Sequence, residues 1–251
     1  MILAIIQARV NSTRLPNKIF SDIEGKPLIW HVVNRIKSSK KNEKIVIATS
    51  VNPLDDKLEE WCIKNNLDCF RGSEDNVLER FYFAARKYNG EIIVRITADD
   101  PFKDPEIIDE VINILISENL DFAYNNYPPS FPEGLDTEVF TFRALEKAYQ
   151  STNDPFELEH VTQFFYRNPQ LFKQKNFSFK KNISNLRWTI DTEKDLEMAR
   201  AVYKFLYKEN EIFLLNDILS LLEKENWIEK INLDTERSTM YKNYKVNNEK
   251  D

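Results

Sequence analysis

The sequence predicts an α/β fold in which a mostly parallel, mixed sheet has helices on both faces. Short apolar runs alternate along the chain with segments whose apolar residues recur three and four positions apart, the pattern of such folds. The first run, Leu3–Gln7, opens directly into a loop of cations and small polar residues. Because open α/β sheets bind ligands beyond the carboxyl ends of their strands, we expect a Rossmann-like sheet with its ligand site there.

Eight segments have the composition of strands. In chain order they are Leu3–Gln7, Lys44–Ala48, Asp68–Phe70, Glu91–Ile96, Asp121–Tyr124, Thr137–Phe140, Phe172–Phe179 and Leu186–Ile190.

The segments between them predict helices. An apolar stripe indicates the first, with Pro27 at its favoured first position, and Ser73 is expected to cap another. The predicted helices are Leu28–Ile36, Pro53–Asn65, the helix after Ser73, Pro105–Ser117, Phe142–Tyr149, Pro155–Arg167, Thr192–Tyr207 and Leu215–Glu225.

Composition limits the class of protein. The chain has 251 residues, 42% of them hydrophobic and 30% charged, as expected for a globular protein. No linker or repeat interrupts it, so we expect a single domain over residues 1–240 and a polar, frayed tail over 241–251. A net charge of −6 argues against nucleic acid or an anionic membrane as a partner.

Two cysteines and two histidines provide neither a disulfide framework nor zinc-site spacing. The N-terminus has no features of a signal peptide, and no window approaches eighteen uninterrupted apolar residues. We therefore expect a cytoplasmic protein that does not span a membrane.

The loop after the first strand has the composition of a phosphate-binding site. Arg9, Arg14 and Lys18 lie within ten positions, and guanidinium and ammonium groups are suited to bind phosphate oxygens. Ser12, Thr13 and the backbone amides around Asn11 would supply further donors. The loop lacks both the Walker pattern and the dinucleotide fingerprint, in a chain with only 4 glycines. The alternative is a solvated basic turn.

Several motifs in one order resemble those of the cytidylyltransferases that activate sugars. The similarity is greatest to the spore coat polysaccharide biosynthesis protein F group, relatives of the acylneuraminate and 3-deoxy-manno-octulosonate cytidylyltransferases. It extends over about Ile2 to Leu222, and the motifs are Gln7–Lys18, Ile47–Pro53, Phe70–Arg80, Val94–Pro101, Gly134–Phe140, Glu159–Thr162 and Arg187–Thr192.

The resemblance implies a nucleotide-diphospho-sugar transferase type of Rossmann-like fold. Residues 1–120 would mainly bind nucleotide, 121–190 mainly the acceptor, and 191–240 would add C-terminal helices. It also implies that Asp99 and Asp191, each just after a predicted strand, hold a catalytic magnesium ion. Taken singly, Asp99 also suits a turn and Asp191 a helix cap.

Further residues are assigned only through the resemblance. Arg71, Ser73 and the backbone near Ala8 would lie against the pyrimidine, although Arg71 also suits a surface position. Acceptor-binding residues would be Asn125, Asp136, Glu138, His160 and Arg187, and a structural histidine is nearly as good an interpretation of His160. His31 lies in an apolar helix and is expected to pack rather than to react.

Three positions depart from the usual pattern of the group. Asn11 and Asn17 replace glycines, and asparagine is the non-glycine residue that best tolerates a positive φ. Ala98 replaces a glycine before Asp99, and its methyl group would narrow a ligand pocket.

The predicted activity is magnesium-dependent transfer of CMP from CTP to an anionic sugar or sugar-like acid, with release of pyrophosphate. In that reaction Arg9, Arg14 and Lys18 would bind the triphosphate, while Asp99 and Asp191 would place the metal. The product would serve polysaccharide or glycan synthesis. Three alternatives stay open: another nucleoside triphosphate, a glycosyltransferase of related architecture, and a non-catalytic nucleotide-binding module. The acceptor, a protein general base and a homodimer are left open as well.

Overall fold

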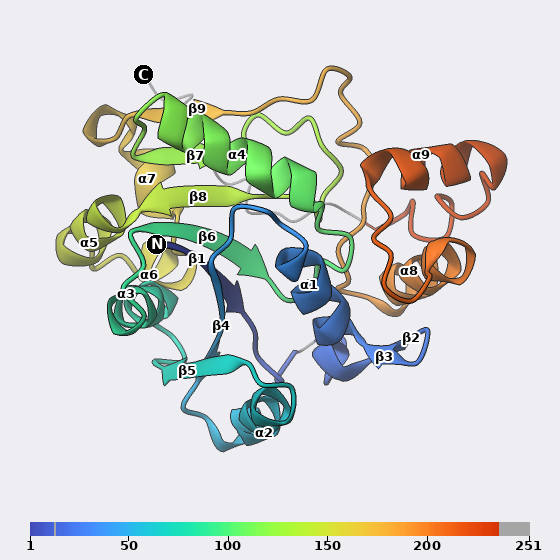
Figure 1. The fold of residues 1–251 in the computed structure, drawn as a ribbon, viewed down its shortest axis with the longest axis horizontal. Coiled ribbons are helices and arrows are strands. Elements are labelled where there is room, and N and C mark those ends of the chain that lie inside the picture. The colour runs from blue at the N-terminus through green and yellow to red at the C-terminus, as the bar shows by residue number, and fades with distance from the viewer. Residues whose placement is uncertain (13, 236–251) are drawn as a thin grey trace.

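A computed structural model describes residues 1–12 and 14–235. Seven strands form one mixed sheet in the order β5-β4-β1-β6-β8-β7-β9 (Figure 1). Only β8 runs against its neighbours in this sheet, pairing antiparallel with β6 and β7. The strands are β1 (Ile2–Gln7), β4 (Lys44–Ser50), β5 (Asp68–Gly72), β6 (Ile92–Thr97), β7 (Phe122–Tyr124), β8 (Glu138–Thr141) and β9 (Gln174–Asn176). The predicted α/β class is confirmed.

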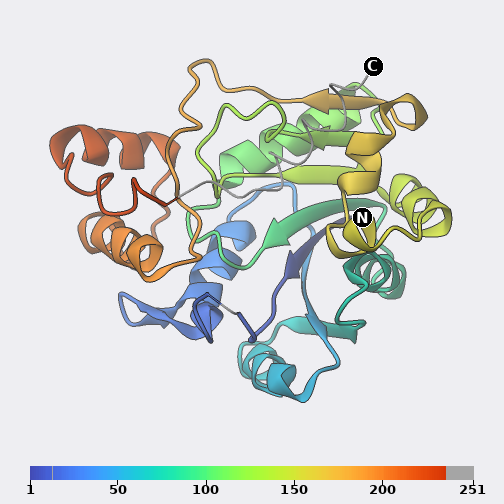
Figure 2. The ribbon, with the colours of Figure 1, turned by 180° about the vertical axis from the view of Figure 1, so that it is seen from behind.

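Helices cover both faces of the sheet, as Figures 1 and 2 show from opposite sides. Successive β1 side chains point to opposite faces, so Ala4 and Ile6 join one core cluster and Leu3 and Ile5 the other. The first cluster includes side chains of α1 (Leu28–Lys37), α2 (Asp56–Lys64), α4 (Pro105–Ser117), α8 (Glu193–Leu206) and α9 (Leu215–Lys224). The second includes α3 (Val77–Lys87), α5 (Phe142–Ser151), α6 (Pro155–Glu159) and α7 (Gln163–Arg167).

Short elements complete the fold. A hairpin of β2 (Asp22–Ile23) and β3 (Lys26–Pro27), which the sequence did not predict, precedes α1. Pro27 is therefore the residue before α1 rather than its first residue. Three single-turn 3-10 helices are η1 (Lys18–Phe20), η2 (Pro53–Asp55) and η3 (Pro169–Leu171).

The predicted strand Leu186–Ile190 is the main error in the secondary structure. This segment forms only an isolated bridge between Arg187 and Glu133 and joins no sheet ladder. Backbone bonds hold it to two other segments: Glu133 N–H donates to Leu186 O, Trp188 N–H donates to Glu133 O, and Ile190 N–H donates to Asp99 O. Local β-propensity did not predict that this segment stays outside the sheet.

Two helix predictions also need correction. The helix after Ser73 begins at Val77, because Asn76 Oδ1 accepts the backbone N–H of Glu79, whereas Ser73 Oγ accepts that of Asn76 one turn earlier. The predicted helix Pro155–Arg167 is broken between α6 and α7, where Val161 adopts a φ of 46°. The buried Val161 side chain enters the core at this break. Similarly, the predicted strand Phe172–Phe179 is paired only over β9.

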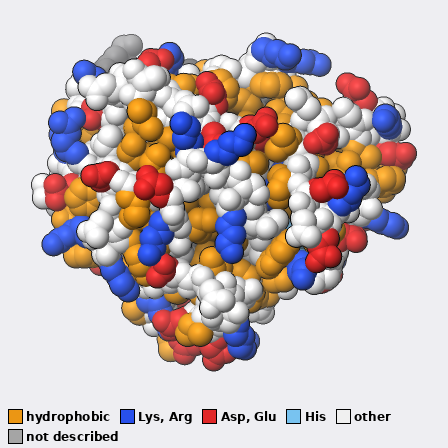
Figure 3. All heavy atoms as spheres, viewed as in Figure 1, with side chains coloured by type: hydrophobic (Ala, Val, Ile, Leu, Met, Phe, Trp, Pro, Cys, Tyr) orange, Lys and Arg blue, Asp and Glu red, His pale blue; other side chains and the backbone are white. Residues whose placement is uncertain are grey.

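Basic and acidic side chains are interspersed on the face shown in Figure 3. Within residues 1–12 and 14–235, no helix is both long and apolar enough to cross a membrane. The predicted tail, 241–251, lies outside the part of the chain that the structure describes.

Candidate active site

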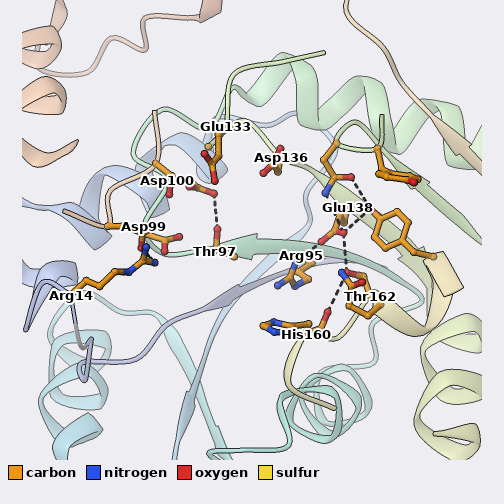
Figure 4. Close-up of a pocket in the computed structure, with 17 residues that line it drawn as sticks. Arg14, Arg95, Thr97, Asp99, Asp100, Glu133, Asp136, Glu138, His160 and Thr162 are labelled. Atoms are coloured by element: carbon orange, nitrogen blue, oxygen red, sulfur yellow. Dashed lines mark hydrogen bonds and ion pairs between the residues drawn. The ribbon is translucent and has the colours of Figure 1, made fainter. Parts of the chain in front are cut away.

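A pocket of about 230 Å³ lies over β6 and β8, and Thr189 and Asp191 border it on one side. Figure 4 shows the labelled side chains converging on it, with Arg14 and Asp99 at one end and His160 and Thr162 at the other. Its lining is strongly polar and consists of Arg14, Arg95, Thr97, Asp99, Asp100, Asn126, Tyr127, Glu133, Gly134, Asp136, Glu138, His160, Thr162, Gln163, Tyr166, Thr189 and Asp191.

Lys18 joins the two predicted metal-binding aspartates. Its Nζ lies 2.8 Å from Asp99 Oδ2 and 2.9 Å from Asp191 Oδ1, and it also donates to the carbonyl oxygen of Ile190 at 2.9 Å. Burial disfavours the charged ammonium, but attraction by the two carboxylates outweighs burial and raises the pKa of Lys18. The ammonium therefore stays protonated between the two aspartates.

Local backbone geometry places Lys18 here. Asn17 adopts a φ of 57° at the start of η1, so the expectation of a positive φ at this position is confirmed. Asn11 is not among the described residues with a positive φ, so its substitution for glycine needs no such geometry. Asp99 lies two residues after the end of β6, and the bond from Ile190 N–H to Asp99 O, 2.9 Å long, brings Asp191 beside it.

Arg187 lies beneath the site in a buried ionic network. Its guanidinium contacts Glu133 at 2.6 Å, Asp191 Oδ2 at 2.9 Å and Asp195 at 3.0 Å. Burial lowers its pKa, but the hydrogen bond that Arg187 donates to Asp195 and the attraction of Glu133 outweigh burial, so the pKa of Arg187 is raised. Arg187 thus orients Asp191 and is absent from the pocket lining, which favours a positioning role over the predicted contact with an acceptor.

The helix cap near Asp191 is made by other residues. Thr192 and Asp195 form a capping box at the start of α8, and Asp195 Oδ2 accepts the backbone N–H of Asp191. The carboxylate of Asp191 is therefore available to the pocket side, where Arg14 also reaches it at 2.9 Å. Capping does not account for this aspartate.

The donor set suits magnesium. Magnesium commonly takes one or two protein carboxylates and completes its shell with phosphates and water. Asp99 and Asp191 present two carboxylates that already converge on one cation, the Lys18 ammonium. Among residues 1–12 and 14–235 no group of three or more histidines, cysteines and acids is placed to hold a metal.

A hydrogen-bonded network forms the other end of the pocket. Glu138 Oε2 pairs with Arg95, while Glu138 Oε1 accepts from Tyr166 at 2.8 Å and from Thr162 at 2.9 Å. Burial raises the pKa of Glu138, but the attraction of Arg95 and the hydrogen bonds from Arg95, Tyr166 and Thr162 together outweigh burial, so the pKa is lowered. Asn126 Nδ2 lies 3.4 Å from the same carboxylate. These groups present a surface rich in hydroxyls and amides.

Asp100 is turned away from Asp99. Its Oδ2 accepts from the Thr97 hydroxyl at 2.6 Å and pairs with buried Lys103 at 2.9 Å. Lys103 Nζ also donates to the carbonyl oxygen of Asp136, which ties the loop before β8 to the site. His160 lines the pocket, and its burial lowers the pKa of the imidazole, so the ring is neutral near pH 7.

The first loop is only partly in the pocket. Arg14 lines it, with a side chain 63% exposed. Arg9 is half-buried in the same loop. The pocket lining includes neither Arg9 nor its neighbours Ala8, Asn11 and Ser12. The backbone N–H of Val10 donates a hydrogen bond to Asp55 Oδ1 at 2.8 Å, which fixes the loop at this point. Thr13 lies outside the described residues.

Arg71, Ser73 and Asn125 have structural partners. The Arg71 guanidinium donates to the carbonyl oxygens of Ser50 and Asn52 and pairs with Asp56 and Glu59, which supports the surface alternative. Ser73 Oγ accepts the Asn76 N–H at the turn before α3. The buried amide of Asn125 donates to Leu135 O and accepts from Thr137 N–H, so it shapes the pocket loop rather than facing an acceptor.

Two small residues near the predicted nucleotide site have packing roles. Gly72 is not a positive-φ glycine; a Cβ there would lie 3.1 Å from Arg80 Cγ, so the glycine makes room for that side chain. The buried Arg80 guanidinium donates to Ser73 O, and burial lowers its pKa to about 10. Ala98 packs in the hydrophobic core and is not among the lining residues, so its methyl group does not narrow this pocket.

Several lining residues escaped the sequence interpretation. Arg95 and Thr97, which belong to a quoted motif, alternate with apolar residues in β6, and such polar positions within a buried strand are a usable signal. Tyr166 gave no such signal, because only the folded chain brings it to Glu138. Asn126 was expected to offer an amide contact, and it lines the pocket.

A mostly parallel α/β sheet with a cationic loop, one aspartate just beyond the carboxyl end of β6 and a second brought beside it is the arrangement expected of a nucleotidyltransferase-type enzyme. A family model described as cytidylyltransferase matches residues 3–242. The chain therefore belongs to the cytidylyltransferase family and is a nucleotidyltransferase.

Individual relatives agree with this assignment. An uncharacterised protein of Methanocaldococcus jannaschii is 36% identical over 233 residues, covering 92% of this chain and 94% of the relative. The spore coat polysaccharide biosynthesis protein SpsF of Bacillus subtilis is 35% identical over 215 residues, covering 81% and 86%. A solved cytidylyltransferase structure from Leptospira borgpetersenii superposes with a TM-score of 0.87 at 31% identity, covering 94% of this chain and 98% of the other.

Proposed function

We propose that this enzyme transfers CMP from CTP to a sugar or sugar-like acid in a magnesium-dependent reaction that releases pyrophosphate. The observation that supports it best is the convergence of Asp99, Asp191, Lys18 and Arg14 at one end of a polar pocket. Two carboxylates for a metal and two cations for phosphates are the groups that nucleotidyl transfer needs.

The cations of the first loop would bind the triphosphate. Arg14 and Lys18 already lie within 2.9 Å of Asp191, so phosphates coordinated near that carboxylate would be within their reach. Arg9, in the same loop, would add a third donor group. The base would extend from there toward the ends of β4 and β5, because the network around Glu138 occupies the pocket on the other side.

Asp99 and Asp191 would hold magnesium. When bound, the metal would neutralise charge on the α-phosphate and on the departing pyrophosphate. Arg187 keeps Asp191 oriented through its bond to Oδ2, while Lys18 and Arg14 contact Oδ1.

The acceptor would occupy the other end of the pocket. Its hydroxyl, phosphate or phosphonate oxygen forms a bond to the α-phosphorus as the bond to the β-phosphate oxygen breaks, and pyrophosphate leaves. Asn126, Thr162 and Tyr166, held by Glu138, would bind its hydroxyl groups. Asp136 and His160 line the same region, and neutral His160 can both donate and accept.

A glycosyltransferase is less well supported. Such enzymes commonly hold their metal through an Asp-x-Asp motif, whereas here Asp100 is adjacent to Asp99 and is bound to Thr97 and Lys103. The match to a family model described as cytidylyltransferase also favours nucleotidyl transfer over glycosyl transfer.

The test is pyrophosphate release with each of the four nucleoside triphosphates, magnesium, and a panel of ulosonic acids, sugar phosphates and small phosphonates. We expect turnover with CTP that is abolished by a chelator and by Asp99→Ala. We also expect Lys18→Ala to lose far more activity than the matched Lys40→Ala, since Lys18 contacts Asp99 and Asp191 whereas Lys40 is exposed and is not among the pocket-lining residues. Wild-type turnover by Asp99→Ala would refute the metal assignment.

A further inference from the structure

Lys18 occupies the point at which the oxygens of the proposed metal site converge. Its Nζ is 2.8 Å from Asp99 Oδ2, 2.9 Å from Asp191 Oδ1 and 2.9 Å from Ile190 O. The Lys18 side chain is only 11% exposed, so these contacts are largely shielded from water.

A divalent ion at these carboxylates would compete with the ammonium. Magnesium binds oxygen at about 2.0–2.1 Å, so an ion ligated by Asp99 Oδ2 and Asp191 Oδ1 would lie near Nζ. Two positive charges placed so close together repel each other strongly in a partly buried site. Metal binding is therefore weakened while Lys18 stays paired with both carboxylates.

Both oxygens of Asp191 also contact arginines. Arg14 reaches Oδ1 at 2.9 Å and Arg187 reaches Oδ2 at 2.9 Å. The negative charge of this aspartate is thus already compensated before any metal arrives. A free divalent ion gains little from entering, whereas an ion that arrives with a polyphosphate brings new partners for the displaced Lys18.

We propose that Lys18 is a resident counter-cation that makes divalent-metal binding depend on the nucleotide. The phosphates would accept the Lys18 ammonium, release Asp99 and Asp191, and so admit the metal together with the nucleotide. This inference rests on the proposed function, because it assumes that the two aspartates are the metal ligands.

The direct test is binding of Mn2+ to the full-length protein in the absence of nucleotide, followed by electron paramagnetic resonance of free Mn2+. We expect weak binding by the wild type and at least about tenfold tighter binding by Lys18→Met, because the competing charge is gone. Lys18→Arg, which keeps the charge, should stay weak. Lys40→Met, which removes an exposed lysine outside the pocket, should match the wild type.

A second measurement compares melting temperatures and can be made on the wild type by itself. Mn2+ added to the free wild-type protein should raise its melting temperature only slightly. Mn2+ added to the protein already bound to a non-hydrolysable CTP analogue should raise the melting temperature much more. For Lys18→Met, Mn2+ alone should already give a large shift. This comparison stays informative if Lys18→Met is produced in poor yield.

The outcomes separate the inference from the proposed function. Tight binding of Mn2+ to the wild type without nucleotide, or unchanged affinity in Lys18→Met, overturns the inference even if turnover with CTP needs magnesium. Wild-type turnover that is unaffected by a chelator instead overturns the metal assignment in the proposed function, and the inference with it.

Discussion

The backbone N–H of Ile190 donates to the backbone carbonyl oxygen of Asp99 at 2.9 Å. This bond joins two residues that are 91 positions apart in the printed sequence and places the following residue, Asp191, beside Asp99. Because the segment of Ile190 belongs to no sheet ladder, the site depends on this contact and on the buried network of Arg187 for its geometry. Several predictions concern these supports.

Replacing Arg187 by methionine should destabilise the protein by about 3–5 kcal/mol. The change leaves the buried carboxylates of Glu133 and Asp195 without their principal counter-charge, and breaking a buried pair on one side costs about this much. Urea unfolding measures the free energy. The matched control is Arg143→Met, whose side chain is 85% exposed in its pair with Asp121 and should cost at most about 1 kcal/mol. Equal losses in the two variants would contradict the structural role of Arg187.

Gly134→Ala should disrupt the pocket more than Gly25→Ala disturbs the hairpin. Gly134 has a φ of +105°, and an added Cβ would lie 2.7 Å from the Thr189 backbone nitrogen. Gly25 also has a positive φ, of +75°, but open space surrounds its Cβ position, so only about 1 kcal/mol of backbone strain is expected. Melting temperatures and pyrophosphate release report the two effects. Full activity in Gly134→Ala would show that the loop can move aside.

Glu138 should stabilise the fold above pH 4.5 and lose this effect in acid. Arg95 and hydrogen bonds outweigh burial, so the folded pKa lies below the ordinary value of 4.5. As the pH falls below 4.5 the unfolded chain binds the proton first, and the stabilisation is lost as the pH passes through the folded pKa. The difference in unfolding free energy between wild type and Glu138→Gln should therefore shrink below pH 4.5. A difference that does not vary with pH would be evidence against a charged Glu138.

His31 should make the protein less stable as the pH falls from 6.5 toward 4. Burial lowers its pKa from 6.5 to about 4, so in this interval the unfolded chain takes up a proton that the folded chain does not. Its ring packs against Tyr203 at a centroid distance of 4.4 Å and lies 2.8 Å from Ile23 O, as expected for a packing residue. The loss is on the order of 3 kcal/mol, and it should be absent in His31→Phe. Chemical unfolding at several pH values measures it, and parallel curves for the two proteins would contradict it.

The sequence by itself determined the alternation of strands and helices. Periodic apolar residues must be buried in any compact fold, so local spacing indicates α1, α4 or α8 without knowledge of their partners. It also indicated Asp99 and Lys18 as candidate site residues, because both follow strands whose carboxyl ends share one edge of a parallel sheet. Motifs in order added the family, which the family model confirms.

The tertiary structure alone decided which polar side chains meet. Arg71 and Asn125 looked like ligand-binding residues in the sequence, yet carbonyl and carboxylate groups from other segments bind them. Glu138 acquires Tyr166 and Thr162 from the region around α7, and Lys18 acquires Asp191 from the far end of the chain. Hydrogen bonds act over about 3 Å, whereas sequence patterns report only local neighbours and burial, so these partnerships exist only once distant segments are packed.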